Sequence, residues 1–173
     1  MRPRSWLGRH SISFPHQLAV FFSVHVAGML VGITLLPLRV AGGTVQQPGG
    51  TTAAALFAAN SKLVALIFLI SAFSGGVAAL LIVGVNGLRY GLALAAATPA
   101  VPVHTPMDQL LALVFPWLEF VALIGMAALG AAIFWRLWFS SRLLGARLVT
   151  GVCLLSVASL LAAAGMEARV LAA

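Results

Sequence analysis

The chain has 173 residues, of which 62% are hydrophobic and only 8% are charged, whereas soluble domains average about 25% charged residues. This composition excludes a soluble globular protein, because too few polar side chains are available to cover a water-exposed surface. The net charge of +7 comes mainly from arginines at the ends of apolar segments. Arginines in such places are typical of membrane topology signals and headgroup contacts, so a nucleic-acid partner is not expected.

The first apolar run, Leu18 to Leu36, is long enough to cross a bilayer core of about 30 Å as a helix. Arg2, Arg4 and Arg9 precede this run, as basic residues precede the core of a signal peptide. The run is longer than a signal-peptide core, and no convincing small-x-small cleavage pattern ends it. We therefore interpret it as a retained first span.

The second apolar block, Ala53 to Ala97, is about twice as long as one crossing requires. It contains either one tilted helix with a surface segment or two helices that fold back at Gly75 and Gly76. Two crossings place the N-terminal arginines on the same side as the cluster of Arg136, Arg142 and Arg147, as the positive-inside rule requires. We therefore expect five crossings, with four as the alternative, and a cytoplasmic N-terminus.

Two further apolar blocks complete the expected architecture, an all-α polytopic helix bundle that forms a single transmembrane domain over residues 1–173. Segments rich in proline and glycine, Ala41 to Thr52 and Thr98 to Pro106, are expected as outer loops. The bilayer is therefore the expected environment of most side chains. The expected spans are about 18–36, 56–73, 77–97, 110–135 and 148–167.

Charged side chains inside these spans need a partner or a function, because a charge in the bilayer core is costly. Arg89 and Glu119 fall at about 18 and 24 Å from the cytoplasmic side, so we expect a buried ion pair between the third and fourth spans. Such a pair either lines a polar pocket or pathway, or locks a small bundle. Lys62 and Glu167 allow a second, shallower pair, but we favour the interpretation that Lys62 simply extends to the interface.

His25 lies within the first span, where a histidine can ligate haem or relay protons. Haem ligation across a bundle needs a second buried axial ligand, and His10, His16 and His104 all fall outside the predicted core. We therefore favour a hydrogen bond between helices as the role of His25.

Small residues recur at helical spacing, as in the segments Gly28 to Gly32 and Gly84 to Gly87, and such residues let helices approach closely. The sequence contains no nucleotide-binding glycine loop, paired-histidine zinc helix or nucleophile elbow. Its single cysteine, Cys153, excludes an internal disulfide. We therefore expect neither catalytic residues nor a metal or cofactor site, and we favour a protein that is not an enzyme by itself over one that is.

Several polar and small residues, taken in order, resemble the stage II sporulation protein M family. They are Asn60, Gly75-Gly76, Asn86-Gly87-Leu88-Arg89-Tyr90-Gly91, Pro116-Trp117-Leu118-Glu119 and the late Glu167. The resemblance covers about Phe57 to Arg169, and its most specific part is the Asn-Gly-x-x-x-Gly element followed by the helical glutamate. The positions before Glu119 lack the histidine and glycine that the family often has, so no catalytic histidine is carried over.

The resemblance implies a multi-pass scaffold of the bacterial inner membrane that works with other membrane subunits and with cell-wall hydrolases in sporulation and peptidoglycan remodelling. Short relatives resemble proteins encoded with circular bacteriocins, which implies an alternative role in maturation, export or immunity of a small hydrophobic peptide, beside an ATP-binding transporter subunit. A small-solute or proton pathway is a third hypothesis, and a homo-oligomer is compatible with each. The expected functional residues are Asn60, Asn86, Gly87, Arg89, Gly91, Glu119 and Glu167, followed by Lys62 and His25.

Overall fold

The computed structural model describes residues 13–35, 52–97, 105–140 and 144–172, and these ranges contain five helices and no strand. The predicted all-α fold is confirmed. Each predicted span overlaps one helix, although most of the helices extend beyond the predicted bounds, α5 by five residues at its C-terminal end. The helices are α1 (Phe14–Leu35), α2 (Ala53–Ser74), α3 (Val77–Ala97), α4 (Pro106–Phe139) and α5 (Ala146–Ala172). The N-terminal arginines, Arg39, Arg142, His10, His104 and most of the two predicted outer loops lie outside the described residues.

The helical hairpin predicted at Gly75 and Gly76 is present between α2 and α3. Both glycines have positive φ angles, 63° and 96°, in the region where a side chain is unfavourable. The N–H of Gly75 donates to the carbonyl of Ser71 and closes the last turn of α2. Trp135 Nε1 donates to the carbonyl of Gly75 at 3.1 Å, so the turn is also attached to α4.

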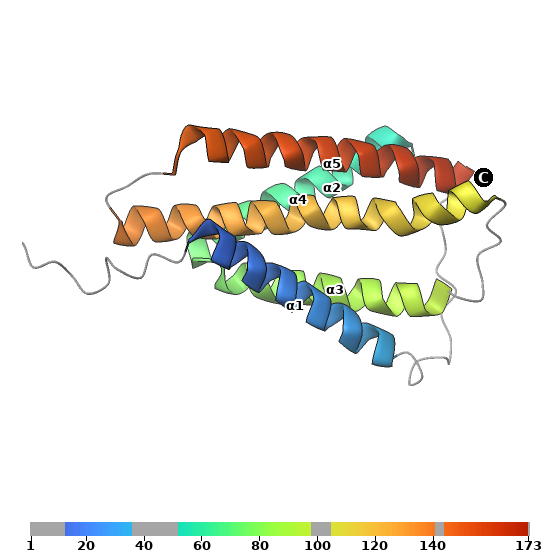
Figure 1. Ribbon diagram of the computed structural model, residues 1–173, viewed down its shortest axis with the longest axis horizontal. Helices are drawn as coiled ribbons and strands as arrows, with labels where there is room; N and C mark the ends of the chain where they lie inside the picture. The colour runs from blue at the N-terminus through green and yellow to red at the C-terminus, as the bar shows by residue number, and fades with distance from the viewer. Residues whose placement is uncertain (1–12, 36–51, 98–104, 141–143, 173) are drawn as a thin grey trace, which may run out of the picture.

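The contacts between helices fix their relative directions. Asn60 of α2 is hydrogen-bonded to Glu119 of α4, and Ser71, further along α2, is hydrogen-bonded to Ala127, so α2 and α4 run the same way. α1 and α3 also run the same way as each other, whereas α5 runs back along α4 (Figure 1). Successive helices therefore alternate in direction, which is the arrangement that five crossings require.

α4 is the central helix of the bundle, since it packs against α1, α2 and α5. Most side chains between Phe120 and Ala132 are buried, and most of them are alanine or glycine. Small side chains bring the neighbouring backbones close: a Cβ added at Gly130 would lie 2.5 Å from the carbonyl oxygen of Phe68. Helix association in a membrane depends on such close packing, because lipid tails are as apolar as the side chains.

α1 and α3 pack backbone against backbone through glycines. The small-residue spacing in the sequence allowed such a close approach, but it did not indicate which helices would pack together. A Cβ added at Gly28 would lie 2.3 Å from the carbonyl oxygen of Gly84, and one added at Gly91 would lie 2.1 Å from that of Met29. No side chain fits at these distances without moving the partner helix. The glycines therefore hold α1 and α3 together as one layer of the bundle.

The protein is a multi-pass membrane protein. Four helices, α1, α2, α4 and α5, are long and apolar enough to cross a membrane, and α3 contains a shorter apolar segment, Val77–Leu92. Large hydrophobic side chains face outward, among them Phe73, which is 83% exposed, and Leu81, which is 72% exposed. Such an outer surface is typical of helices in contact with lipid tails, and the helical fold satisfies the backbone polar groups internally.

Candidate functional site

A polar contact between α2 and α4 lies inside the apolar bundle. The side-chain amide of Asn60 donates a hydrogen bond to the carboxylate of Glu119, and both residues are partly buried. Both were expected from the sequence as functional residues, although no contact between them was predicted. The contact joins the two helices, and its partial burial strengthens the hydrogen bond because less water competes for it.

Two more helices bring polar side chains to the same place. Glu167 of α5 and Tyr90 of α3 both lie close enough to the Glu119 carboxylate to interact with it electrostatically. We call Asn60, Tyr90, Glu119 and Glu167 the polar layer. Four different helices each contribute one member, so the layer is formed only by the tertiary structure.

The polar layer lies toward one end of the bundle, the end where α2 begins and α3 and α5 end; we call this the polar end. Asn60, Tyr90 and Glu167 are each about 8–11 Å along their helices from that end, at ~1.5 Å per residue. The layer is therefore within the membrane-spanning part of the bundle but nearer one surface than the other.

The predicted ion pair between Arg89 and Glu119 is not formed in the described structure. Arg89 is exposed on the outward side of α3, whereas Tyr90, the next residue, turns into the bundle and packs on Phe120 with ring centroids 4.8 Å apart. Successive residues of a helix point about 100° apart. Similar depths of Arg89 and Glu119 in the membrane were therefore not enough to form an ion pair, because the two side chains leave their helices in different directions.

Lys62 is also exposed, and within the described residues it makes no ion pair with Glu167. It lies two positions after Asn60 on α2, so the side chain leaves the opposite side of the helix from the polar layer. This orientation agrees with the interpretation that Lys62 extends toward the interface. Glu167 instead joins Glu119 in the polar layer.

His25 is buried, with 1% of its surface exposed, and forms the predicted hydrogen bond between helices. Its Nδ1 lies 3.3 Å from the carbonyl oxygen of Val83 on α3, and its ring lies against Phe120 with centroids 3.9 Å apart. A carbonyl oxygen only accepts, so Nδ1 donates and carries the proton. The Nε2 atom is buried and has no hydrogen-bond partner within the described residues.

The glycines of the Asn-Gly-x-x-x-Gly element have a packing role. Cβ atoms added at Gly87 and Gly91 would clash with the carbonyl oxygens of His25 and Met29 on α1. Asn86 is partly buried, and no side-chain hydrogen bond is formed by it within the described part of the chain. The structure therefore brings together Asn60, Glu119 and Glu167 of the predicted set, and uses Gly87 and Gly91 to dock α3.

Sequence reasoning missed several polar residues that the structure places wholly or partly in the interior. Tyr90 was inside the family-like element but was not expected to face Glu119. Gln17 and Ser71 are buried at 5% and 0% exposure, and Ser71 Oγ donates to the carbonyl of Ala127 at 2.6 Å. A signal for Gln17 was available, because it precedes Phe21 and His25 at four-residue spacing and so shares one face of α1.

The polar layer can hold protons or bind a polar partner group, because it contains two acids, an amide and a phenol. No group of three or more histidine, cysteine, aspartate or glutamate side chains converges anywhere in the described ranges. The chain matches no protein-family model, no curated protein and no solved structure, so its resemblance to the sporulation family stays a prediction.

Proposed function

We propose that this chain is a non-enzymatic scaffold subunit of a complex in the bacterial inner membrane, as its resemblance to the stage II sporulation protein M family implies. One observation carries the proposal: Arg89 is exposed on the outward side of α3. The exposed residues Val77, Leu81 and Val85 precede it at four-residue spacing on the same side. We call these four residues the Arg89 face.

The Arg89 face is a binding surface for a partner helix. Arg89 is about 12 Å along α3 from the polar end of the bundle and about 18 Å from the other end of α3, at ~1.5 Å per residue. A guanidinium facing lipid tails at such a depth is costly, and membrane proteins commonly satisfy it with a carboxylate from another helix. A bidentate arginine–carboxylate pair would give both affinity and register. The partner is therefore a membrane subunit with an acidic residue in its span, in a complex that also includes a cell-wall hydrolase.

Site-specific photocrosslinking in intact cells tests the proposal. A crosslinker at Leu81, on the Arg89 face, is compared with one at Leu154 on α5, which has a similar exposure of 66% against 72%. We expect a defined heterologous product from Leu81 only, which Arg89→Leu abolishes and the charge-retaining Arg89→Lys preserves in part. The proposal would be contradicted if Arg89→Leu left the crosslinked products unchanged and if the protein were purified as a monomer without partners in several mild detergents.

Gene neighbourhood separates the scaffold from the role in peptide maturation or export. Sporulation or wall-remodelling genes beside this one favour the scaffold. A short peptide precursor and an ATP-binding transporter subunit favour the peptide role.

A proton pathway is the second candidate, and the electrostatic interaction between Glu119 and Glu167 favours it. Two carboxyl groups that interact in a low-dielectric bundle do not readily ionise together, so one of them tends to hold a proton. Proteoliposomes with a pH-sensitive dye inside provide the test: Glu119→Gln should abolish proton uptake that the wild type catalyses, and Arg89→Leu should not. Uptake no faster than in protein-free liposomes would eliminate this candidate.

A further inference from the structure

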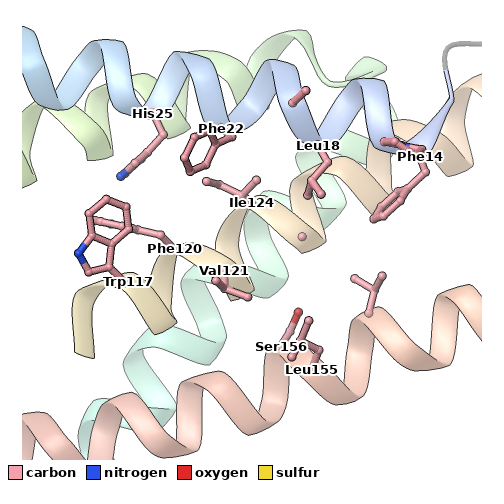
Figure 2. A pocket seen from close by; sticks show the side chains of 14 residues that line it. Phe14, Leu18, Phe22, His25, Trp117, Phe120, Val121, Ile124, Leu155 and Ser156 are labelled. Atoms are coloured by element: carbon pink, nitrogen blue, oxygen red, sulfur yellow. The ribbon is translucent and has the colours of Figure 1, made fainter. Parts of the chain in front are cut away.

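A cavity of about 530 Å³ lies between α1, α4 and α5, apart from the polar layer and from the Arg89 face. Figure 2 shows side chains from these helices converging on it, with His25 reaching from α1 toward Phe120 and Trp117 of α4. Its size is within the range of about 300–1,000 Å³ that is usual for small-molecule sites. The lining residues used below are Phe22, His25, Trp117, Phe120, Leu155 and Ser156.

The cavity opens toward the lipid. Phe22, Trp117 and Leu155 line it and are 51%, 43% and 57% exposed, so its rim belongs to the outer surface of the bundle. Along α1 it extends from Phe14, the first helical residue, to His25, a distance of about 16 Å. A molecule dissolved in the bilayer can therefore enter from the side, without passing through water.

Two polar side chains interrupt an otherwise apolar and aromatic lining. Ser156 is 4% exposed and faces the backbone of Gly125, whereas His25 is held by its hydrogen bond to Val83. Because Nδ1 of the neutral imidazole carries the proton, Nε2 is an acceptor, and it is buried with no partner among the described residues. An unpaired acceptor in an apolar interior is unfavourable, and a hydroxyl group would satisfy it.

We propose that this cavity binds a ring-hydroxylated lipid of the quinol type. The lipid-facing rim selects a membrane-soluble molecule, and the aromatic rings of Phe22, Trp117 and Phe120 favour a flat ring. The hydroxyl on that ring donates to His25 Nε2 after a small shift of the His25 ring or of the adjoining Phe120 ring opens this buried atom to the cavity. The apolar tail follows α1 toward Phe14. The site does not involve Arg89, so it is independent of the partner helix proposed above.

Binding of two probes tests the hydrogen bond. An alkyl benzoquinol with a ten-carbon chain and its dimethyl ether, which has no hydroxyl donor, are measured by equilibrium dialysis against protein in phosphatidylcholine nanodiscs without oxygen. A hydrogen bond worth about 1 kcal/mol predicts roughly fivefold tighter binding of the quinol. His25→Leu should reduce the affinity for the quinol to that for the ether. Equal affinities of the two probes for the wild type would overturn the proposal.

A matched pair of variants on α5 tests the position of the site. Leu155 lines the cavity and Leu161 does not, and their exposures are nearly equal at 57% and 54%. Leu155→Trp should fill the mouth and weaken quinol binding at least tenfold, whereas Leu161→Trp should leave it unchanged. Neither variant disturbs a buried residue, so the test holds even if His25→Leu fails to fold. Unchanged binding in Leu155→Trp would place the quinol elsewhere and overturn the proposal.

Discussion

The side-chain amide of Asn60 on α2 donates a hydrogen bond to the carboxylate of Glu119 on α4, inside a bundle of apolar helices. Arg89, which has the opposite charge and a similar predicted depth, faces away from Glu119. The hydrogen-bond partner of Glu119 is therefore a neutral amide of another helix.

This arrangement predicts the outcome of two double-mutant cycles. Asn60→Ala and Glu119→Ala should be coupled by about 0.6 kcal/mol, the average for polar contacts between membrane helices, and by no more than about 1.7 kcal/mol, the largest value for such contacts. Arg89→Leu and Glu119→Ala should instead be additive within about 0.5 kcal/mol, as expected for residues without contact. The free energy of reversible unfolding, measured on the detergent-solubilised variants, gives the coupling energy of each cycle. A larger coupling for Arg89 than for Asn60 would show that the contact is wrongly assigned.

The glycine contact between α1 and α3 predicts a sharp difference between glycines. Gly91→Ala should destabilise the fold by about 1–3 kcal/mol, because its Cβ would lie 2.1 Å from the carbonyl oxygen of Met29. Gly151→Ala in α5 is the control, since nothing lies within 4 Å of a Cβ there. It should be neutral or stabilise by up to about 1 kcal/mol through helix propensity. Thermal unfolding followed by circular dichroism distinguishes these outcomes, and equal effects would rule out close packing of α1 on α3.

The turn between α2 and α3 predicts a cost for a side chain at Gly75. Its φ of 63° is unfavourable for alanine, and an added Cβ would lie 2.8 Å from the ring of Phe134. Gly75→Ala should therefore lower stability by about 1–3 kcal/mol. Gly145→Ala, with open space around the added Cβ, should change it by less than about 0.5 kcal/mol. Chemical denaturation of both variants in the same detergent provides the measurement, and a neutral Gly75→Ala would exclude this turn.

The alternating helix directions predict which ends of the bundle share a side of the membrane. In a Cys153→Ala background, Thr105→Cys before α4 should react with an impermeant thiol reagent added outside intact cells. Ala146→Cys, at the start of α5, should react only after the membrane is opened. Both positions are exposed in the structure. Labelling on the same side would contradict five crossings, and the reverse labelling would contradict the cytoplasmic N-terminus.

The sequence alone determined the helical membrane fold and the approximate positions of its helices. Runs of apolar residues must form helices in lipid because no other open structure satisfies the backbone there. The paired glycines between Ser74 and Val77 marked the turn, since their φ angles belong to a region that other residues avoid. These are local properties of the chain, so they could be predicted without knowing which helices touch.

Only the tertiary structure decided which polar residues meet. Depth along a helix follows from counting residues, but the direction of a side chain depends on how the helix is rotated in the bundle, and its neighbours decide that rotation. Gly87 and Gly91 must face α1 for the backbones to touch. With that side of α3 committed to α1, Tyr90 turns toward Phe120 and Arg89 is left on the outer surface, so Glu119 pairs with Asn60.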